Sequence, residues 1–276
     1  MKLKSSIYIS KEDSNPRFVN QDGIQKELVA ICKKWKKYLQ LYVNRTGEFL
    51  ANPECPWENT ERAIVSTLSA AISRYYRESI VLEESRVLKP GNNWKSEAKR
   101  PRSWGRCDLW VSMRGISAGP SSFNFYLEAK TSHRRSADGL GDFLRRRYGI
   151  SKIFRDYLKS NKKGRLDQRS SYRKARKHEH YVIGLLVTPL HGKEIEFKEV
   201  KAELRDAFES RLQLDLRRRV TEAEKKNARR MQRFPTVALI LRDQDGAHPG
   251  MVASFTVLGA SKGLGKRKNG IAEALV

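Results

Sequence analysis

Long hydrophobic runs are absent from this 276-residue chain, and no apolar stretch approaches the ~20 residues that a membrane-spanning helix requires. The first residues, MKLKSSIYIS, include lysines but no apolar stretch behind them, so we expect no secretory signal peptide. Cysteine is also scarce, since Cys32, Cys55 and Cys107 are far apart and form no CxxC pair. Three scattered cysteines argue against a disulfide framework and against a zinc site, and they are typical of a protein of the reducing cytoplasm.

Acidic residues are too few to balance the basic ones. The chain has 31 Asp and Glu against 56 Lys and Arg, a formal net charge of +25 and a pI of about 10.1. An excess of this size is tolerated when a polyanion neutralises it, and counterion release from nucleic acid drives such binding. We therefore predict DNA as the partner, with RNA as the open alternative, and no membrane. Charge alone names a class of partner and no chemistry, because ribosomal and membrane-surface proteins can be as basic.

Hydrophobic periodicity predicts a domain in which helices and strands alternate. Helices are predicted over residues 18–44, 57–76, 141–159 and 199–232. Strands are predicted over residues 79–88, 106–113, 123–130, 181–188, 236–241 and 251–258. This order favours the α/β class, with a mixed central β-sheet flanked by helices. We divide the chain into an N-terminal helical arm (1–52), a main domain (53–258) with a basic loop at 160–180, and a flexible basic tail (259–276).

Two neighbouring predicted strands carry acidic residues among apolar ones. Asp108 lies within RCDLWVSM, and Glu128-Ala129-Lys130 ends FNFYLEAK. Side chains alternate along a strand, so Glu128 and Lys130 share one face of the sheet. A hairpin that pairs Asp108 near Glu128 brings two carboxylates and an ammonium group together. Two such carboxylates repel each other, and a divalent cation that prefers oxygen ligands, Mg²⁺ or Mn²⁺, relieves the repulsion.

A third carboxylate is predicted on the helix that begins near Trp57. At about 100° per residue from Trp57, Glu61 falls at about 40°, in the middle of the apolar face, whereas Glu58 falls at about 100°, on its edge. A carboxylate on a buried helix face is costly unless it meets a cation or hydrogen-bond donors. Glu61 is therefore the first candidate for a metal ligand, and Glu58 is the reserve.

At these residues the chain resembles the PD-(D/E)xK nuclease superfamily, whose members have the restriction-endonuclease-like fold. That family has a helix, a strand, a hairpin that bears Asp and then (Asp/Glu)-x-Lys, a helix and a further strand. The matching residues here are Asp108, Glu128 and Lys130, with Glu61 in the place of the family's first-helix glutamate. Cys107 stands where the motif has proline. The resemblance covers residues 56–188 and leaves the N-terminal helix and the last third of the chain outside it.

The resemblance implies the catalytic roles. Asp108, Glu128, Glu61 and the carbonyl of Ala129 would bind Mg²⁺, for which Mn²⁺ would substitute, and Lys130 would serve the attacking water. The main domain would then be a nuclease domain.

The implied activity is that of a Mg²⁺-dependent DNA endonuclease, a hydrolase of phosphodiester bonds, and we favour a restriction or other defence enzyme. The alternatives are a recombination or repair nuclease of the same fold and a non-catalytic nucleic-acid-binding protein. A homodimer is expected by analogy, since one centre cuts one strand.

Basic residues follow the predicted centre in the sequence, and their excess of one sign exceeds what solubility requires. We predict that they contact phosphates, which positions a nucleic acid without reading its bases. The predicted nucleic-acid-binding residues are Arg134, Arg135, Arg145, Arg146, Lys162, Lys163, Arg173, Lys174, Arg176 and Lys177.

Overall fold

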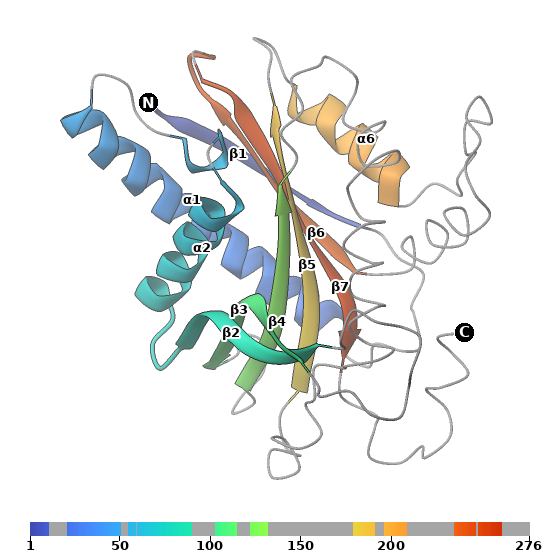
Figure 1. Ribbon diagram of the computed structural model, residues 1–276. Coiled ribbons are helices and arrows are strands. Elements are labelled where there is room, and N and C mark those ends of the chain that lie inside the picture. The colour runs from blue at the N-terminus through green and yellow to red at the C-terminus, as the bar shows by residue number, and fades with distance from the viewer. Residues whose placement is uncertain are drawn as a thin grey trace.

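One β-sheet organises the described part of the chain (Figure 1). The computed structural model describes residues 1–10, 21–50, 55–58, 60–89, 103–114, 122–131, 179–190, 196–208, 235–246 and 248–260. In chain order the elements are β1 (Leu3–Ile9), α1 (Gln21–Phe49), η1 (Pro56–Glu58), α2 (Glu61–Tyr75), β2 (Ile80–Lys89), β3 (Ser103–Arg114), β4 (Ser122–Thr131), β5 (Glu179–Leu190), α6 (Phe197–Phe208), β6 (Thr236–Asp243) and β7 (Gly250–Ala260).

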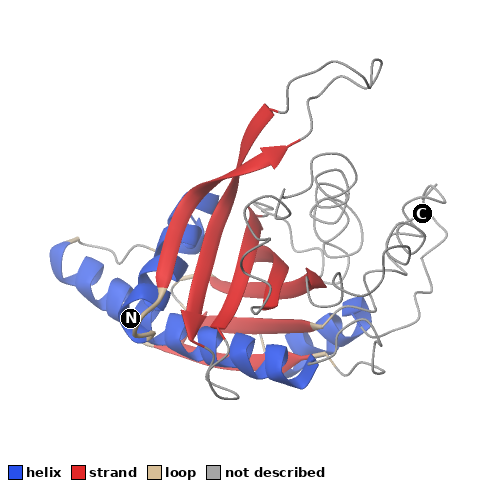
Figure 2. Ribbon diagram, turned by 90° about the horizontal axis from the view of Figure 1, so that it is seen from below, coloured by secondary structure: helices blue, strands red, loops and turns tan. Residues whose placement is uncertain are grey.

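The seven described strands are arranged in the order β1-β6-β7-β5-β4-β3-β2. Strands β2, β3 and β4 form an antiparallel meander, and β6 and β7 form an antiparallel hairpin between β1 and β5. The pair β4–β5 is parallel. The predicted α/β class and the predicted mixed sheet are therefore confirmed for these elements. Figure 2 shows how strongly the sheet twists from one edge to the other.

Helices α1 and α2 cover one face of the sheet and enclose the hydrophobic core. Apolar side chains recur along α1 at the helical spacing that the sequence predicts, and each is at most 1% exposed: Leu28, Ile31, Trp35 and Leu39. They form one cluster with the buried residues of α2 and with the inward side chains of β3 to β7. Burial of this face is what holds α2 against the sheet.

Helix α6 packs against β1 and β6. Its buried residues Val200 and Leu204 do not belong to the cluster beneath α1 and α2. They therefore cover the opposite face of the sheet, where Ala238 and Ile240 of β6 are also buried. Both faces of this part of the sheet are thus covered, which explains the nearly continuous apolar sequence of β6.

Strand β1 and helix α1, which fall in the predicted N-terminal arm, contribute to the same sheet and core as the main domain. Strand β1 pairs antiparallel with β6, and Leu3 and α1 belong to the central cluster. The sequence predicted no strand here. In β1 the buried positions are Leu3 and Tyr8, and the positions between them are partly or fully exposed, so the strand lacks a regular apolar alternation.

The predicted helix 57–76 begins later than expected. Trp57 lies in the short 3₁₀ helix η1, and α2 starts at Glu61 after the N-cap residue Thr60. The predicted helix 141–159, the part of helix 199–232 beyond residue 208, the loop residues 160–178 and the tail residues 261–276 lie outside the described residues. No helix in the described ranges is both long and apolar enough to cross a membrane.

Thr60 caps the helix that carries Glu61. Its Oγ1 accepts a hydrogen bond from the Ala63 backbone N–H at 3.2 Å. We expect Thr60→Ala to lower the free energy of unfolding by about 1 kcal/mol, because the first turn of α2 loses its cap. Thr60→Ser keeps the hydroxyl group and should retain most of that stability. Urea unfolding of the three proteins tests this, and equal losses in both variants would assign the effect to the threonine methyl group instead.

Candidate active site

The pairing register of β3 and β4 places Asp108 and Glu128 on the same face of the sheet. Leu109 lies opposite Leu127, and both are fully buried in the core beneath α1 and α2. Since side chains alternate, the next residue of each strand, Asp108 and Glu128, projects from the other face. Both are partly exposed. The residue beside Glu128 on β5 is Gly184, which adds no side chain next to the carboxylate.

The Asp108 carboxylate is fixed where the two strands separate. The ladder between β3 and β4 ends at the Leu109–Leu127 pair. Beyond it, Asp108 Oδ2 accepts a hydrogen bond from the Ala129 backbone N–H at 2.6 Å. The side chain therefore takes the place of the next backbone partner of β4, which orients the carboxylate at the end of that strand.

Glu61 reaches the same end of β4 from the first turn of α2. Its Oε2 accepts a hydrogen bond from the Thr131 backbone N–H at 3.3 Å. In a strand, N–H groups two residues apart point to the same side, about 7 Å from each other. The carboxylates of Asp108 and Glu61 therefore lie along one flank of β4. The helix dipole also favours a negative charge at the N-terminus of α2.

The donor set at this flank fits a hard divalent cation. The C=O and N–H of one strand residue point to the same side, so the Ala129 carbonyl faces the flank on which Asp108 and Glu61 lie. Together with Glu128 on the adjoining face, the end of β4 offers carboxylate and carbonyl oxygens. Mg²⁺ and Mn²⁺ prefer such ligands.

Two buried polar atoms on β3 and β4 have no hydrogen-bond partner among the described residues. Thr131 Oγ1 belongs to the residue whose N–H contacts Glu61, and Trp110 Nε1 lies two positions from Asp108 on β3. Buried polar atoms are almost always paired in folded proteins. Because side chains alternate, Thr131 shares the core face of β4 with Ala129, and Trp110 shares the opposite face with Asp108, so the two atoms do not mark one common ligand.

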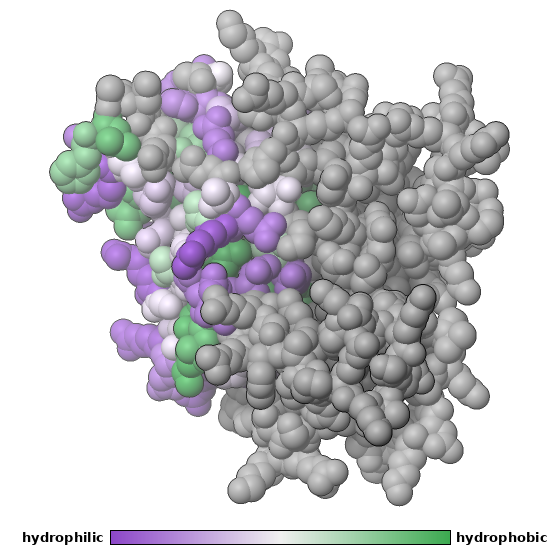
Figure 3. Space-filling view, viewed as in Figure 1, coloured by the Kyte–Doolittle hydropathy of each residue, from purple (hydrophilic) through white to green (hydrophobic). Residues whose placement is uncertain are grey.

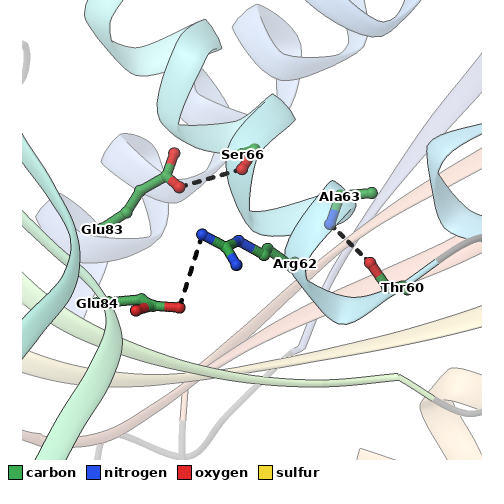
Figure 4. A network of polar contacts seen from close by, with 6 residues as sticks. All are labelled: Thr60, Arg62, Ala63, Ser66, Glu83 and Glu84. Atoms are coloured by element: carbon green, nitrogen blue, oxygen red, sulfur yellow. Dashed lines mark hydrogen bonds and ion pairs between the residues drawn. The ribbon is translucent and has the colours of Figure 1, made fainter.

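Two polar contacts join α2 to β2 beside the site (Figure 4). Ser66 Oγ donates to Glu83 Oε2 at 3.1 Å, and Arg62 forms an ion pair with Glu84 at 4.0 Å. Glu84 has a positive φ of 49° and interrupts the β2–β3 ladder opposite Asp108. A positive φ is uncommon outside glycine and frequent at functional sites. No residue pattern singles out Glu84, because its distinguishing feature is a backbone angle.

Glu58, the reserve candidate, lies elsewhere. It is exposed at the end of η1, and its carboxylate lies near Cys55 and His248 rather than at β4. Burial and, next, the charge of Glu58 raise the pKa of the Cys55 thiol to about 12. The angular comparison of Glu58 with Glu61 assumed one helix through Trp57, whereas Glu58 belongs to η1 and Glu61 begins the separate helix α2.

Lys130 continues β4 two positions after Glu128, where its backbone pairs opposite Leu186 of β5. Its side chain lies outside the described part of the chain. So do all the basic residues predicted to contact nucleic acid: Arg134, Arg135, Arg145, Arg146, Lys162, Lys163, Arg173, Lys174, Arg176 and Lys177.

The described surface has a basic cluster that was not among the predicted nucleic-acid-binding residues. Lys34 and Lys37 of α1 and Arg74 of α2 lie 5.6, 5.2 and 6.0 Å from the centre of the Tyr75 ring. Cations at these distances interact with the ring face. The signal was the lysine spacing in KKWKK, which puts Lys34 and Lys37 on neighbouring turns. Figure 3 shows a mainly hydrophilic described surface, with an apolar patch at the end of α1 where Phe49 and Leu50 are exposed.

Comparison of the chain with protein-family models, with curated proteins and with solved structures gives no match. The geometry at the end of β4 therefore carries the functional proposal.

Proposed function

We propose that this chain is a metal-dependent DNA endonuclease of the restriction-endonuclease-like fold, in a restriction or other defence system. The observation that carries the proposal is that Asp108 and Glu61 accept hydrogen bonds from the backbone N–H groups of Ala129 and Thr131 on β4, while Glu128 projects from the face of the sheet that Asp108 shares. The order of α2, β2, the β3–β4 hairpin and the parallel strand β5 supports it, because the nuclease superfamily that the motif resembles has these elements in this order.

The proposed site consists of metal ligands and one lysine that acts on the attacking water. Asp108, Glu61, Glu128 and the Ala129 carbonyl would hold Mg²⁺, which supplies charge neutralisation at the scissile phosphate and a bound water of lowered pKa. The backbone N–H groups of Ala129 and Thr131 orient two of these carboxylates at the end of β4. Lys130 would orient the attacking water or accept its proton, and it would stabilise negative charge on the phosphate.

The positive charge of the chain supports DNA as the substrate. The basic cluster around Tyr75 lies at the C-terminal end of α2, and Glu61 lies at its start. At 1.5 Å per residue the two are separated by about 21 Å along the helix. About six base pairs of duplex cover this length, so a polynucleotide rather than a mononucleotide would contact both.

Cleavage of supercoiled plasmid by the full chain tests the proposal. Nicked or linear DNA should form with Mg²⁺ or Mn²⁺ and not with a chelator, whereas no cleavage with either ion would refute the nuclease. Discrete fragments from long DNA would favour a restriction enzyme, and cuts confined to junctions or damaged sites would favour a repair nuclease. A parallel reaction with RNA decides the substrate. A non-catalytic binding protein would bind DNA equally well with and without divalent ions.

The Tyr75 cluster makes a separate prediction about binding. Removing two cations in Lys34→Ala with Lys37→Ala should weaken DNA binding at low salt and reduce the slope of log K against log[salt] by about 2, because each phosphate contact contributes about 0.9. Fluorescence anisotropy over a salt series measures the slope. The matched control is Lys2→Ala with Lys4→Ala, which removes the same charge from exposed positions on or beside β1. Equal slopes in the two double variants would show that only net charge matters.

A further inference from the structure

Three potential ligands of different chemistry meet away from the end of β4. Cys55 precedes η1, Glu58 ends it, and His248 lies in the turn between β6 and β7. One sulfur, one carboxylate oxygen and one ring nitrogen all lie within 4.8 Å of one another. A mixed sulfur, nitrogen and oxygen set suits Zn²⁺ and related transition ions, whereas Mg²⁺ prefers oxygen alone.

The local backbone explains why Cys55 and Glu58 face each other. The Glu58 backbone N–H donates to the Cys55 carbonyl at 2.9 Å, which closes a 3₁₀ turn. Side chains three positions apart are eclipsed in a 3₁₀ helix, so both ligands project from the same side. The short spacing therefore fixes two of the three ligands before the rest of the chain contributes.

Two contacts bring His248 to this pair. Trp57 Nε1, on a fully buried side chain, donates to the Pro249 carbonyl at 3.0 Å. The backbone N–H of His248 donates to Asp243 Oδ2 at 3.3 Å, and Asp243 is itself 5% exposed. These contacts fix the backbone on both sides of the His248 side chain, so the position of the β6–β7 turn relative to η1 is set by buried groups.

We propose that Cys55, Glu58 and His248 bind a Zn²⁺-class transition-metal ion that links η1 to the β6–β7 turn. Three protein ligands leave one tetrahedral position for water, which the exposure of Glu58 makes accessible. The ion fixes the segment that leads into α2 and so stabilises the helix start. This site does not depend on the nuclease proposal, since its residues and its metal differ from those at the end of β4.

Metal binding to the chelator-treated full chain tests the site. Zn²⁺ competition against a chromogenic chelator should show one tight site in addition to any weak one, and Co²⁺ should give the charge-transfer absorption of a thiolate ligand. Cys55→Ser, Glu58→Gln and His248→Gln should each weaken Zn²⁺ binding at least tenfold. Glu58 is exposed, so its variant tests the site without a folding defect.

Two controls separate this site from its neighbours. Cys32→Ala removes a different buried thiol, and Glu61→Gln removes a proposed Mg²⁺ ligand. Both should bind Zn²⁺ as the unmodified chain does, and Cys55→Ser should still cleave DNA with Mg²⁺ if the nuclease proposal holds. Absence of a tight site, or unchanged Zn²⁺ affinity in Glu58→Gln and His248→Gln, would overturn the proposal whatever the outcome of the cleavage assay.

Discussion

Asp108→Ala should abolish metal-dependent DNA cleavage, with a loss of at least about 10³-fold in rate. The variant removes a carboxylate that the Ala129 N–H orients at the end of β4. Loss of a metal ligand forfeits several kcal/mol of transition-state stabilisation, and about 4 kcal/mol corresponds to three decades in rate. Single-turnover cleavage of plasmid at saturating Mg²⁺ measures the loss.

Asp108→Asn divides the effect of charge from the effect of geometry. The amide oxygen can still accept the Ala129 hydrogen bond but carries no charge. We expect this variant to fold with normal stability and to be nearly as inactive as Asp108→Ala. The matched control is Asp245→Asn, which neutralises an exposed aspartate in the β6–β7 turn. If Asp108→Asn cleaves at the rate of the unmodified chain, Asp108 orients β4 and binds no ion.

Trp35→Ala should be the most destabilising of the substitutions considered, at about 3–5 kcal/mol. The side chain is 1% exposed, and it joins α1 to two other elements. Its Nε1 donates to Thr67 Oγ1 of α2 at 3.1 Å, and its ring meets Phe255 of β7 edge-on at 5.9 Å between centroids. A loss of this size is a large fraction of the 5–15 kcal/mol by which a typical native protein is stable.

Trp35→Phe separates the ring from the hydrogen bond. The variant keeps the aromatic contact and removes the indole N–H donor. We expect the free energy of unfolding to fall by only about 1 kcal/mol, because Thr67 Oγ1 still has a hydrogen bond to the Ile64 carbonyl. The control is Phe49→Ala at the end of the same helix. The Phe49 side chain is 82% exposed, so its removal should change the free energy of unfolding by less than about 0.5 kcal/mol. Urea denaturation measures all three. A loss below about 1 kcal/mol in Trp35→Ala would mean that α1 is dispensable to the core.

The predictable part of the fold follows from side-chain periodicity. The stripe from Leu28 to Leu39 predicted α1, and the apolar run in 236–241 predicted β6, because each pattern repeats the period of its element. The face shared by Asp108 and Glu128 also follows from the sequence, since one hairpin register puts the alternating apolar residues Leu109, Val111, Phe125 and Leu127 in the core.

Other features depend on contacts that no local pattern encodes. Strand β1 forms because its backbone pairs with β6, although few of its side chains are buried. The start of α2 is set by its N-cap residue Thr60. Trp57 suggested an earlier start because it fits the apolar face of the helix, but its side chain contacts the β6–β7 turn instead. The cluster of Cys55 and Glu58 with His248 joins positions far apart in the chain, so cysteine spacing gave no signal for it.

The late position of the β6–β7 hairpin in the chain determines when the β-sheet can form during synthesis. Strand β1, near the start of the chain, has its partner in β6, and Ser10 and Thr236 are in contact across 226 positions. Contacts so distant in sequence form slowly. On the ribosome, the first strand must wait until β6 has emerged. We expect nascent chains that end before β6 to be protease-sensitive, because β1 has no partner strand until β6 is synthesised.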